Sequence, residues 1–181
     1  MKVFILYPPI SALERHNNIP SYRGINNLMI PPGIFYLAAF LREHGHTVEV
    51  VDAEARNLDV DNILDMIAQF VPDVLGISAT TVVFHRAVEI AERVKEAFPQ
   101  ITLVIGGAHV SAIPQQALET SPFPIGVIGE GEITFLELLA ALKDGTNLAN
   151  VQGIVFKIGK GGDRSDASNF SRPLFLGVFV S

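Results

Sequence analysis

Short apolar runs alternate along this chain with longer stretches in which apolar residues recur every three or four positions. The short runs predict five buried strands, at residues 2–7, 46–53, 73–79, 101–106 and 124–129. The periodic stretches predict helices at residues 34–44, 62–71, 83–98, 114–119 and 132–145. Because strands and helices alternate, we expect a doubly wound α/β domain with a five-stranded parallel sheet and right-handed crossovers.

The predicted helix ends carry residues that helix termini favour. Pro31 and Pro32 suit the first turn of a helix, where a missing N–H removes no hydrogen bond. Gly45 suits the position after a helix end, and Asp59 or Asp61 can cap the next helix. These signals support the alternation of strands and helices.

The last part of the chain has a different pattern. Residues 153–165, GIVFKIGKGGDRS, predict a β-hairpin with a glycine-rich turn, and the final residues RPLFLGVFVS are mostly apolar. An apolar terminus is typical of a contact surface. We therefore expect an α/β domain over residues 1–148, a hairpin and linker over residues 149–181, and a chain that is a piece of a longer protein.

Composition narrows the possible functions of the 181-residue chain. Hydrophobic residues make up 49% and charged residues 18%, which is sufficient for a folded core. The net charge of −6 argues against a nucleic-acid-binding surface, which needs clustered Lys and Arg. No apolar run approaches the roughly 20 residues of a membrane-spanning helix, so we expect a cytoplasmic protein. The absence of cysteine excludes disulfides and cysteine-ligated zinc or iron–sulfur clusters within the chain.

Open parallel sheets bind ligands outside the carboxyl ends of their strands. In the predicted sheet, these ends carry the loops 8–33, 79–83, 106–112 and 129–132 and the residues after Asp52, most of them rich in glycine, proline or hydroxyl side chains. Adjacent glycines at the end of a strand, as in VIGGAH, indicate that another group approaches the backbone. We therefore expect a binding site at this edge of the sheet.

The small residues at this edge also have a purely structural explanation. Gly106 and Gly107 can form a tight turn without any ligand. Ser78, Thr80 and Thr81 can cap a helix through their hydroxyl groups. Both explanations remain open for these residues.

The charged candidate residues also have a structural explanation that does not involve a ligand. Glu130 and Glu132 precede a predicted helix, where carboxylates are favoured by the helix dipole, and His109 can be an ordinary loop histidine. The chain has no G-x-x-x-x-G-K-[ST] loop, no G-x-G-x-x-G after the first strand and no G-x-S-x-G elbow. Nothing forms a nucleophile–base pair. The residues alone therefore predict a ligand-binding module, with no catalytic residue and no metal ligand.

Four segments, in this order, resemble the N-terminal cobalamin-binding domain of cobalamin-dependent radical SAM enzymes. They are PPGIFYLAAFLREHGHTVEVVDA, DVLGISATT, VIGGAHVSAIP and VIGEGEITFLELL. The resemblance covers roughly residues 1–158, and the ordered set makes it specific, because each segment alone is a weak signal. It implies a flavodoxin-like or Rossmann-like cobalamin-binding fold.

Other cobalamin-binding domains carry the pattern D-x-H-x-x-G, followed by S-x-L and then by G-G. The sequence SAT at residues 78–80 stands in the place of S-x-L, and Gly106 and Gly107 follow at close to the family's spacing. Counting back along the pattern places Gly33 where other members have the histidine that binds cobalt. The resemblance therefore implies base-off cobalamin without a histidine ligand from the protein, as in the radical SAM branch.

The resemblance also implies a slot between strands that receives the dimethylbenzimidazole tail of cobalamin. Side chains at the glycine pair would fill this slot, so Gly107→Leu is expected to abolish binding and to leave the domain folded. The residues expected to contact cobalamin are Pro9, Pro32, Gly33, Ser78, Thr80, Thr81, Gly106, Gly107, His109, Val110, Gly129, Glu130, Gly131 and Glu132.

A catalytic partner is implied as well. In the family, a radical SAM domain of the same polypeptide carries C-x-x-x-C-x-x-C, whose thiolates hold a 4Fe–4S cluster. This chain has no cysteine, so the cluster and S-adenosylmethionine are expected only in a missing domain. The full-length protein is expected to perform methyl transfer or related radical chemistry.

Two other functions stay open beside a cobalamin-binding module. The domain could keep the fold without the cofactor and serve as a docking or structural platform. It could also be a flavodoxin-like binder of another nucleotide-tailed ligand. The spacing from Ser78 to Gly106 favours cobalamin over a flavin, because a flavin needs no deep slot.

Overall fold

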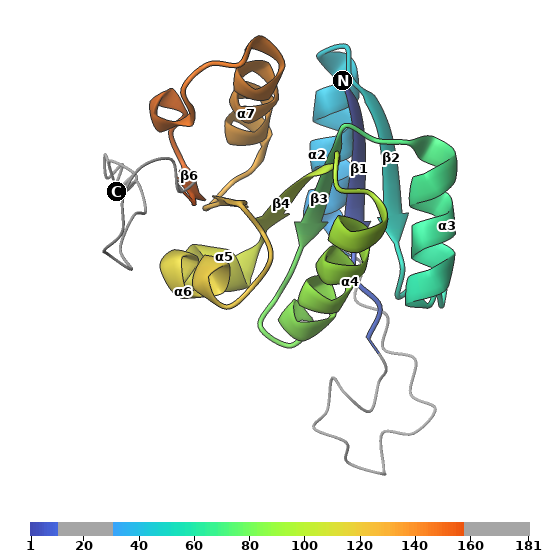
Figure 1. Cartoon of the computed structure of the whole chain (residues 1–181). Coiled ribbons are helices and arrows are strands. Elements are labelled where there is room, and N and C mark those ends of the chain that lie inside the picture. The colour runs from blue at the N-terminus through green and yellow to red at the C-terminus, as the bar shows by residue number, and fades with distance from the viewer. Residues whose placement is uncertain (11–30, 158–181) are drawn as a thin grey trace.

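The computed structural model of this chain describes residues 1–10 and 31–157 (Figure 1). Six strands in these residues form one sheet in the order β2-β1-β3-β4-β5-β6. Their bounds are β1 Lys2–Tyr7, β2 Thr47–Asp52, β3 Val74–Ser78, β4 Thr102–Gly106, β5 Ile125–Val127 and β6 Ile154–Phe156. The first five strands run parallel to their neighbours, and β6 is antiparallel to β5. The predicted doubly wound α/β fold is confirmed.

Helices cover both faces of the sheet. Their bounds are α2 Pro32–Glu43, α3 Val60–Phe70, α4 Phe84–Ala97, α5 Ala108–Ala112, α6 Pro114–Glu119 and α7 Glu132–Asp144. Because crossovers are right-handed, α2 lies on the face opposite to α3 and α4. Figure 1 shows α2 behind the sheet and α4 in front of it, and α2 contacts α7. Within the described ranges, no helix has the length and apolar character needed to cross a membrane.

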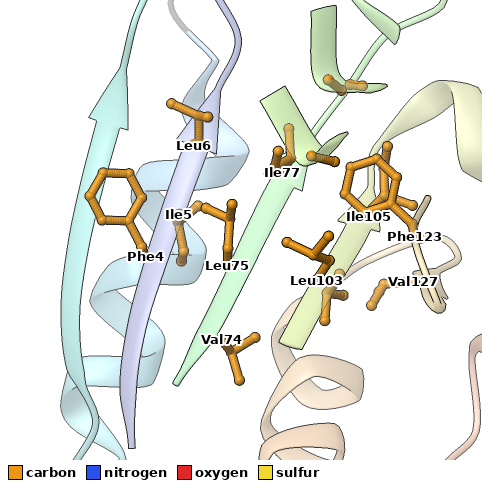
Figure 2. Packing of buried hydrophobic residues seen from close by; sticks show 14 of the residues in the cluster. Phe4, Ile5, Leu6, Val74, Leu75, Ile77, Leu103, Ile105, Phe123 and Val127 are labelled. Atoms are coloured by element: carbon orange, nitrogen blue, oxygen red, sulfur yellow. The ribbon is translucent and has the colours of Figure 1, made fainter. Parts of the chain in front are cut away.

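The central strands are buried on both of their faces. Every residue of β1 from Val3 to Tyr7 exposes 4% or less of its surface. Figure 2 shows apolar side chains of β1, β3 and β4 packed along the sheet. Burial on both faces is typical of parallel sheets, and it explains why these strands are continuous apolar runs in the sequence.

Local signals fix where two of the helices begin and end. Asp59 accepts a hydrogen bond from the Asn62 N–H (2.8 Å) and Asn62 accepts one from the Asp59 N–H (3.3 Å), so Asp59 caps α3 in a capping box. Gly45 follows α2 with φ +80°. The Arg42 guanidinium donates to the Val48 carbonyl at 2.7 Å, which ties the end of α2 to β2.

Two elements differ from the sequence-based expectation. Residues 108–112 form α5, although residues 106–112 were expected to be a loop. The first half of the predicted hairpin forms β6, a sixth strand that pairs with β5, while its second half lies outside the described residues. Strand β5 has three residues, and β6 covers its otherwise open edge. The division at residue 148 stays a prediction, and β6, which lies beyond it, extends the sheet.

Candidate ligand-binding cavity

A cavity of about 160 Å³ opens at the carboxyl end of the sheet, beneath the first turns of α2 and α7. It is the place where the sequence analysis expected a ligand. Its lining residues are Ile5, Gly33, Ile34, Leu37, Gly76, Ile77, Ser78, Val104, Gly106, Gly107, Val127, Gly129, Glu130, Gly131, Glu132 and Phe135.

Small residues on two neighbouring strands leave room for this cavity. In the register of β3 and β4, Gly76 pairs with Val104 and Ser78 pairs with Gly106. Because alternate residues of a strand point to the same face, Gly76, Ser78 and Gly106 share the face that α2 and α7 cover. Larger side chains there would fill the space between the sheet and these helices.

The inner end of the cavity is apolar and buried. Ile5, Val104 and Phe135 expose 2%, 1% and 3% of their surface. A Cβ atom placed on Gly76 would lie 3.2 Å from the Phe135 ring atoms Cε2 and Cζ. The edge of the Phe135 ring therefore forms the end wall, in contact with the backbone of β3.

The mouth of the cavity is polar and open. Gly33, Gly129 and Glu130 are exposed, and Glu132 is half-buried. A Cβ atom on Gly33 or Gly129 would have no other atom within 4 Å, so both positions border empty space. Among the described residues, no lysine or arginine lines the cavity. The charged groups of this described lining are the two carboxylates at the mouth.

Gly106 and Gly107 are adjacent, but each is a glycine for a different physical reason. Gly107 has φ +95°, and a Cβ atom there would lie 2.7 Å from the Ala79 carbonyl oxygen. Gly106 has ordinary strand geometry, and its Cβ atom would be 3.8 Å from Val127. Gly107 is thus required by the backbone itself, whereas Gly106 keeps the cavity open. The expectation that Gly107→Leu leaves the domain folded stays a prediction, and because any side chain there strains the turn, loss of binding in this variant would not by itself identify the cavity.

Ser111 holds two of the cavity loops together. Its hydroxyl donates to the Gly107 carbonyl (3.0 Å) and accepts from the Gly129 N–H (2.9 Å). The loop after β4 is thereby fixed to the loop after β5. Ser111 lies on α5, outside the cavity lining, and acts on the site only through these loops.

His109 lies beside the cavity and does not line it. Its Nδ1 atom is 3.2 Å from Thr81 Oγ1, and its ring stacks on Phe84 with centroids 4.1 Å apart. Burial lowers the pKa of His109 below the ordinary value of about 6.5. The imidazole is therefore mainly neutral at pH 7 and joins the loops after β3 and β4.

The cavity brings together more than half of the residues that were expected to contact a cofactor. These are Gly33, Ser78, Gly106, Gly107, Gly129, Glu130, Gly131 and Glu132. The remaining candidates lie outside it and are Pro9, Pro32, Thr80, Thr81, His109 and Val110. Pro9 lines a separate groove beside α3 and α4, and Val110 is fully buried in the core.

Sequence reasoning missed Gly76, Leu37 and Phe135 as lining residues. Gly76 carried a usable signal, because a glycine inside a buried strand marks a close approach of another group. Leu37 and Phe135 carried none, since a helical apolar residue looks the same whether it faces the core or a cavity. Among the described residues, no three His, Cys, Asp or Glu side chains are placed to hold a metal ion.

Comparison with protein families agrees with this arrangement. Residues 24–139 match the sequence model of the B12-binding domain. The chain belongs to the B12-binding domain family. The matched region of this B12-binding domain contains α2, the strands β2 to β5 and the start of α7, which together form most of the cavity.

Two curated relatives of this B12-binding domain are methyltransferases. The uncharacterized methyltransferase PH0819 of Pyrococcus horikoshii is 33% identical over 158 residues, which are 87% of this chain and 33% of that protein. The cobalamin-dependent radical SAM methyltransferase TokK of Streptomyces tokunonensis is 38% identical over 91 residues, which are 49% of this chain and 13% of TokK. The chain spans a third or less of the length of the curated relatives it matches.

A solved structure supports the same fold. The cobalamin-dependent S-adenosylmethionine radical enzyme OxsB, with aqua-cobalamin and S-adenosylmethionine bound, matches this B12-binding domain with a TM-score of 0.73 and 21% identity. The match covers 89% of this chain and 21% of OxsB. Together, the B12-binding domain match, the similarity to TokK and this shared fold confirm the predicted relation to the cobalamin-binding domains of radical SAM enzymes.

Proposed function

We propose that this chain binds base-off cobalamin and that the nucleotide tail of the cofactor enters the cavity beneath α2 and α7. The observation that carries the proposal is the largely apolar cavity at the carboxyl ends of β3, β4 and β5, where six of the sixteen lining residues are glycine. The corrin ring then lies outside the mouth, beside the loops at this edge of the sheet.

The dimensions and lining of the cavity fit a flat aromatic base. A dry apolar cavity of about 150 Å³ accommodates a benzene-sized ring. The volume of this cavity, about 160 Å³, is sufficient for the inner part of such a base, and the outer part of the base would lie in the open mouth. Side chains on Gly106 or Gly33 would occupy the same space, because a Cβ atom at either position meets no close neighbour.

The polar groups around the cavity suit different parts of the cofactor. The Ser78 hydroxyl makes no side-chain hydrogen bond to another described residue, so it is available to donate to a nitrogen of the base. Glu130 and Glu132 can accept hydrogen bonds from the amide groups of the corrin or from ribose hydroxyls. Because the described lining residues include no lysine or arginine, the phosphate of the tail stays outside the cavity, in water, in this proposal.

Cobalt receives no histidine ligand from this chain in our proposal. Gly33, in the place of the family's histidine, lies in the first turn of α2 and at the mouth of the cavity. None of the four described histidines, His44, His46, His85 and His109, lines the cavity. His16 lies outside the described residues.

The chain acts as one module of a larger radical SAM enzyme in this proposal. TokK, which contains a similar segment, is a cobalamin-dependent radical SAM methyltransferase, OxsB is a cobalamin-dependent S-adenosylmethionine radical enzyme, and this chain spans a small part of the length of each. Because the chain has no cysteine, the iron–sulfur cluster that activates S-adenosylmethionine must be held elsewhere. A bound cobalamin would supply a cobalt centre that carries the methyl group.

The test is anaerobic titration of the 181-residue chain with hydroxocobalamin, followed by desalting and a visible spectrum. We expect retained colour with a base-off spectrum, and no change of that spectrum in His16→Gln or His109→Gln. Gly106→Leu should abolish retention, while Gly106→Ala, the matched control, should keep most of it. Circular dichroism checks that each variant is folded.

Each alternative outcome has a definite meaning. Equal retention by the wild type and a folded Gly106→Leu variant would contradict the placement of the tail in the cavity. A spectrum that changes in His16→Gln or His109→Gln would contradict the absence of a histidine ligand. A wild-type chain that retains no cobalamin at any concentration tested would contradict the proposal as a whole.

A further inference from the structure

The interior of the cavity offers almost no hydrogen bonds to a bound base. Beyond the mouth, the apolar side chains of its described lining are those of Ile5, Ile34, Leu37, Ile77, Val104, Val127 and Phe135, all of which are hydrocarbon. In the part of the chain that the structure describes, Ser78 is the single polar lining side chain between them and the two glutamates at the mouth. The Ser78 hydroxyl is therefore the one side-chain group of the described lining that can form a hydrogen bond with the buried part of the base.

Several backbone groups of the strands and loops beside the cavity are already hydrogen-bonded. Strands β3 and β4 are hydrogen-bonded along the register that pairs Gly76 with Val104, and the Gly106 carbonyl accepts from the Ala79 N–H at 2.9 Å. At the mouth, the Gly129 N–H donates to Ser111 and the Gly131 carbonyl accepts from the Phe135 N–H at 2.7 Å. These groups are not free to bind a ligand that enters the cavity.

The far end of the cavity is also closed by carbon. The edge of the Phe135 ring contacts Gly76 there, and Val104 lies opposite Gly76 on the next strand. A polar atom on the inner edge of a bound base would thus face aromatic and aliphatic carbon. Such an atom loses its hydrogen bonds to water and gains none from the protein.

We infer that this cavity, provided that it binds the tail as proposed, selects cobalamin-like cofactors by the polarity of their lower base. It favours a base with a hydrocarbon edge, such as dimethylbenzimidazole, over adenine. Dimethylbenzimidazole has one free ring nitrogen, which Ser78 can satisfy, and two methyl groups that match the carbon wall. Adenine carries an exocyclic amine and further ring nitrogens, and the described residues at the inner end of the cavity offer them no partner.

The test compares the affinities of the 181-residue chain for two cofactors that differ only in the lower base. Anaerobic titrations monitored by visible absorption give the Kd for cobalamin and for the cofactor with adenine as its base. We expect cobalamin to bind about 10- to 100-fold more tightly, the range in which a pocket discriminates by unpaired polar groups or a few methyl groups.

A pair of isosteric substitutions locates the selectivity. Val104→Thr places a hydroxyl group at the inner end of the cavity and should lower the ratio of the two Kd values several-fold. Val51→Thr makes the same exchange at a buried position that does not line the cavity, and should leave the ratio unchanged. If Val104→Thr does not fold, Val127→Thr tests the same wall closer to the mouth.

The outcomes separate this inference from the function on which it rests. Equal affinity for the two cofactors in the wild type would overturn the selectivity and leave cobalamin binding intact. A ratio that falls as much in Val51→Thr as in Val104→Thr would also overturn it. Failure of the wild type to bind either cofactor would overturn both.

Discussion

The two faces of the sheet use glycine in opposite ways. On the face covered by α2 and α7, Gly106 borders the cavity, and a Cβ atom there would meet no atom closer than 3.8 Å. On the other face, a Cβ atom on Gly126 would lie 2.9 Å from Leu118 Cδ1 and Val155 Cγ1 and 3.1 Å from Val110 Cγ1. One glycine keeps a space open, and the other lets α5, α6 and β6 pack closely.

This difference shows that a strand glycine does not by itself indicate a ligand site. Both residues end or interrupt apolar runs, in VIGG and PIGVIG, and the two sequences look alike. What separates them is the neighbour that a side chain would meet. A larger side chain on the cavity face takes space that a ligand would occupy. A larger side chain on the packed face lowers the stability of the fold.

The largest expected effect is that of Gly126→Val. Its side chain would overlap Leu118, Val155 and Val110 in the core, so we expect a loss of about 3 kcal/mol in the free energy of unfolding. Urea unfolding measures this loss. Gly106→Val, the matched change on the cavity face, should cost less than about 1 kcal/mol. Equal losses in the two variants would show that the two faces do not differ.

The next effect separates the two adjacent glycines. Gly107→Ala must hold φ +95° and place its Cβ atom 2.7 Å from the Ala79 carbonyl oxygen. We expect it to lower the free energy of unfolding by about 2 kcal/mol, whereas Gly106→Ala should change it by less than about 0.5 kcal/mol. Thermal unfolding of the two variants side by side checks this. A Gly107→Ala variant as stable as the wild type would remove the backbone explanation.

Much of the fold and the location of the site could be predicted from the sequence. Parallel strands buried on both faces are continuous apolar runs, so β1, β3 and β4 stand out. Their carboxyl ends then define the edge where ligands bind, and Ser78, Gly106 and Gly129 do lie together there.

The features of the fold and the site that could not be predicted depend on interatomic distances, which a sequence does not contain. Gly106 and Gly107 are the same residue type, and only the position of the Ala79 backbone separates their roles. Val110 and Ser111 are neighbours on α5, yet one is buried in the core and the other fixes the cavity loops through hydrogen bonds. Strand β6 was missed as part of the sheet because its partner β5 is short and because its residues were assigned to a separate hairpin.

A smaller effect concerns the end wall of the cavity. A Cβ atom on Gly76 would be 3.2 Å from two ring atoms of Phe135, which is tight but not prohibitive. We expect Gly76→Ala to cost about 1 kcal/mol of stability in the wild type. In a Phe135→Leu background, which lacks those ring atoms, the same change should cost less. A double-mutant cycle from urea unfolding measures the difference, and strict additivity would show that the two residues do not contact each other.

The smallest expected effect is a pH dependence of stability, to which two histidines, His46 and His109, contribute. Burial, the N-terminal ammonium and Lys143 of α7 lower the pKa of His46, whose Nδ1 atom is buried without a partner, and burial lowers that of His109 on α5. Below about pH 6.5 the unfolded chain therefore binds more protons than the folded domain, so stability falls as the pH drops. The fall should stop once the pH is below the lowered pKa values. Urea midpoints between pH 8 and pH 5 should vary less in His46→Gln and in His109→Gln than in the wild type. An unchanged pH dependence in both variants would assign the acid sensitivity to other groups.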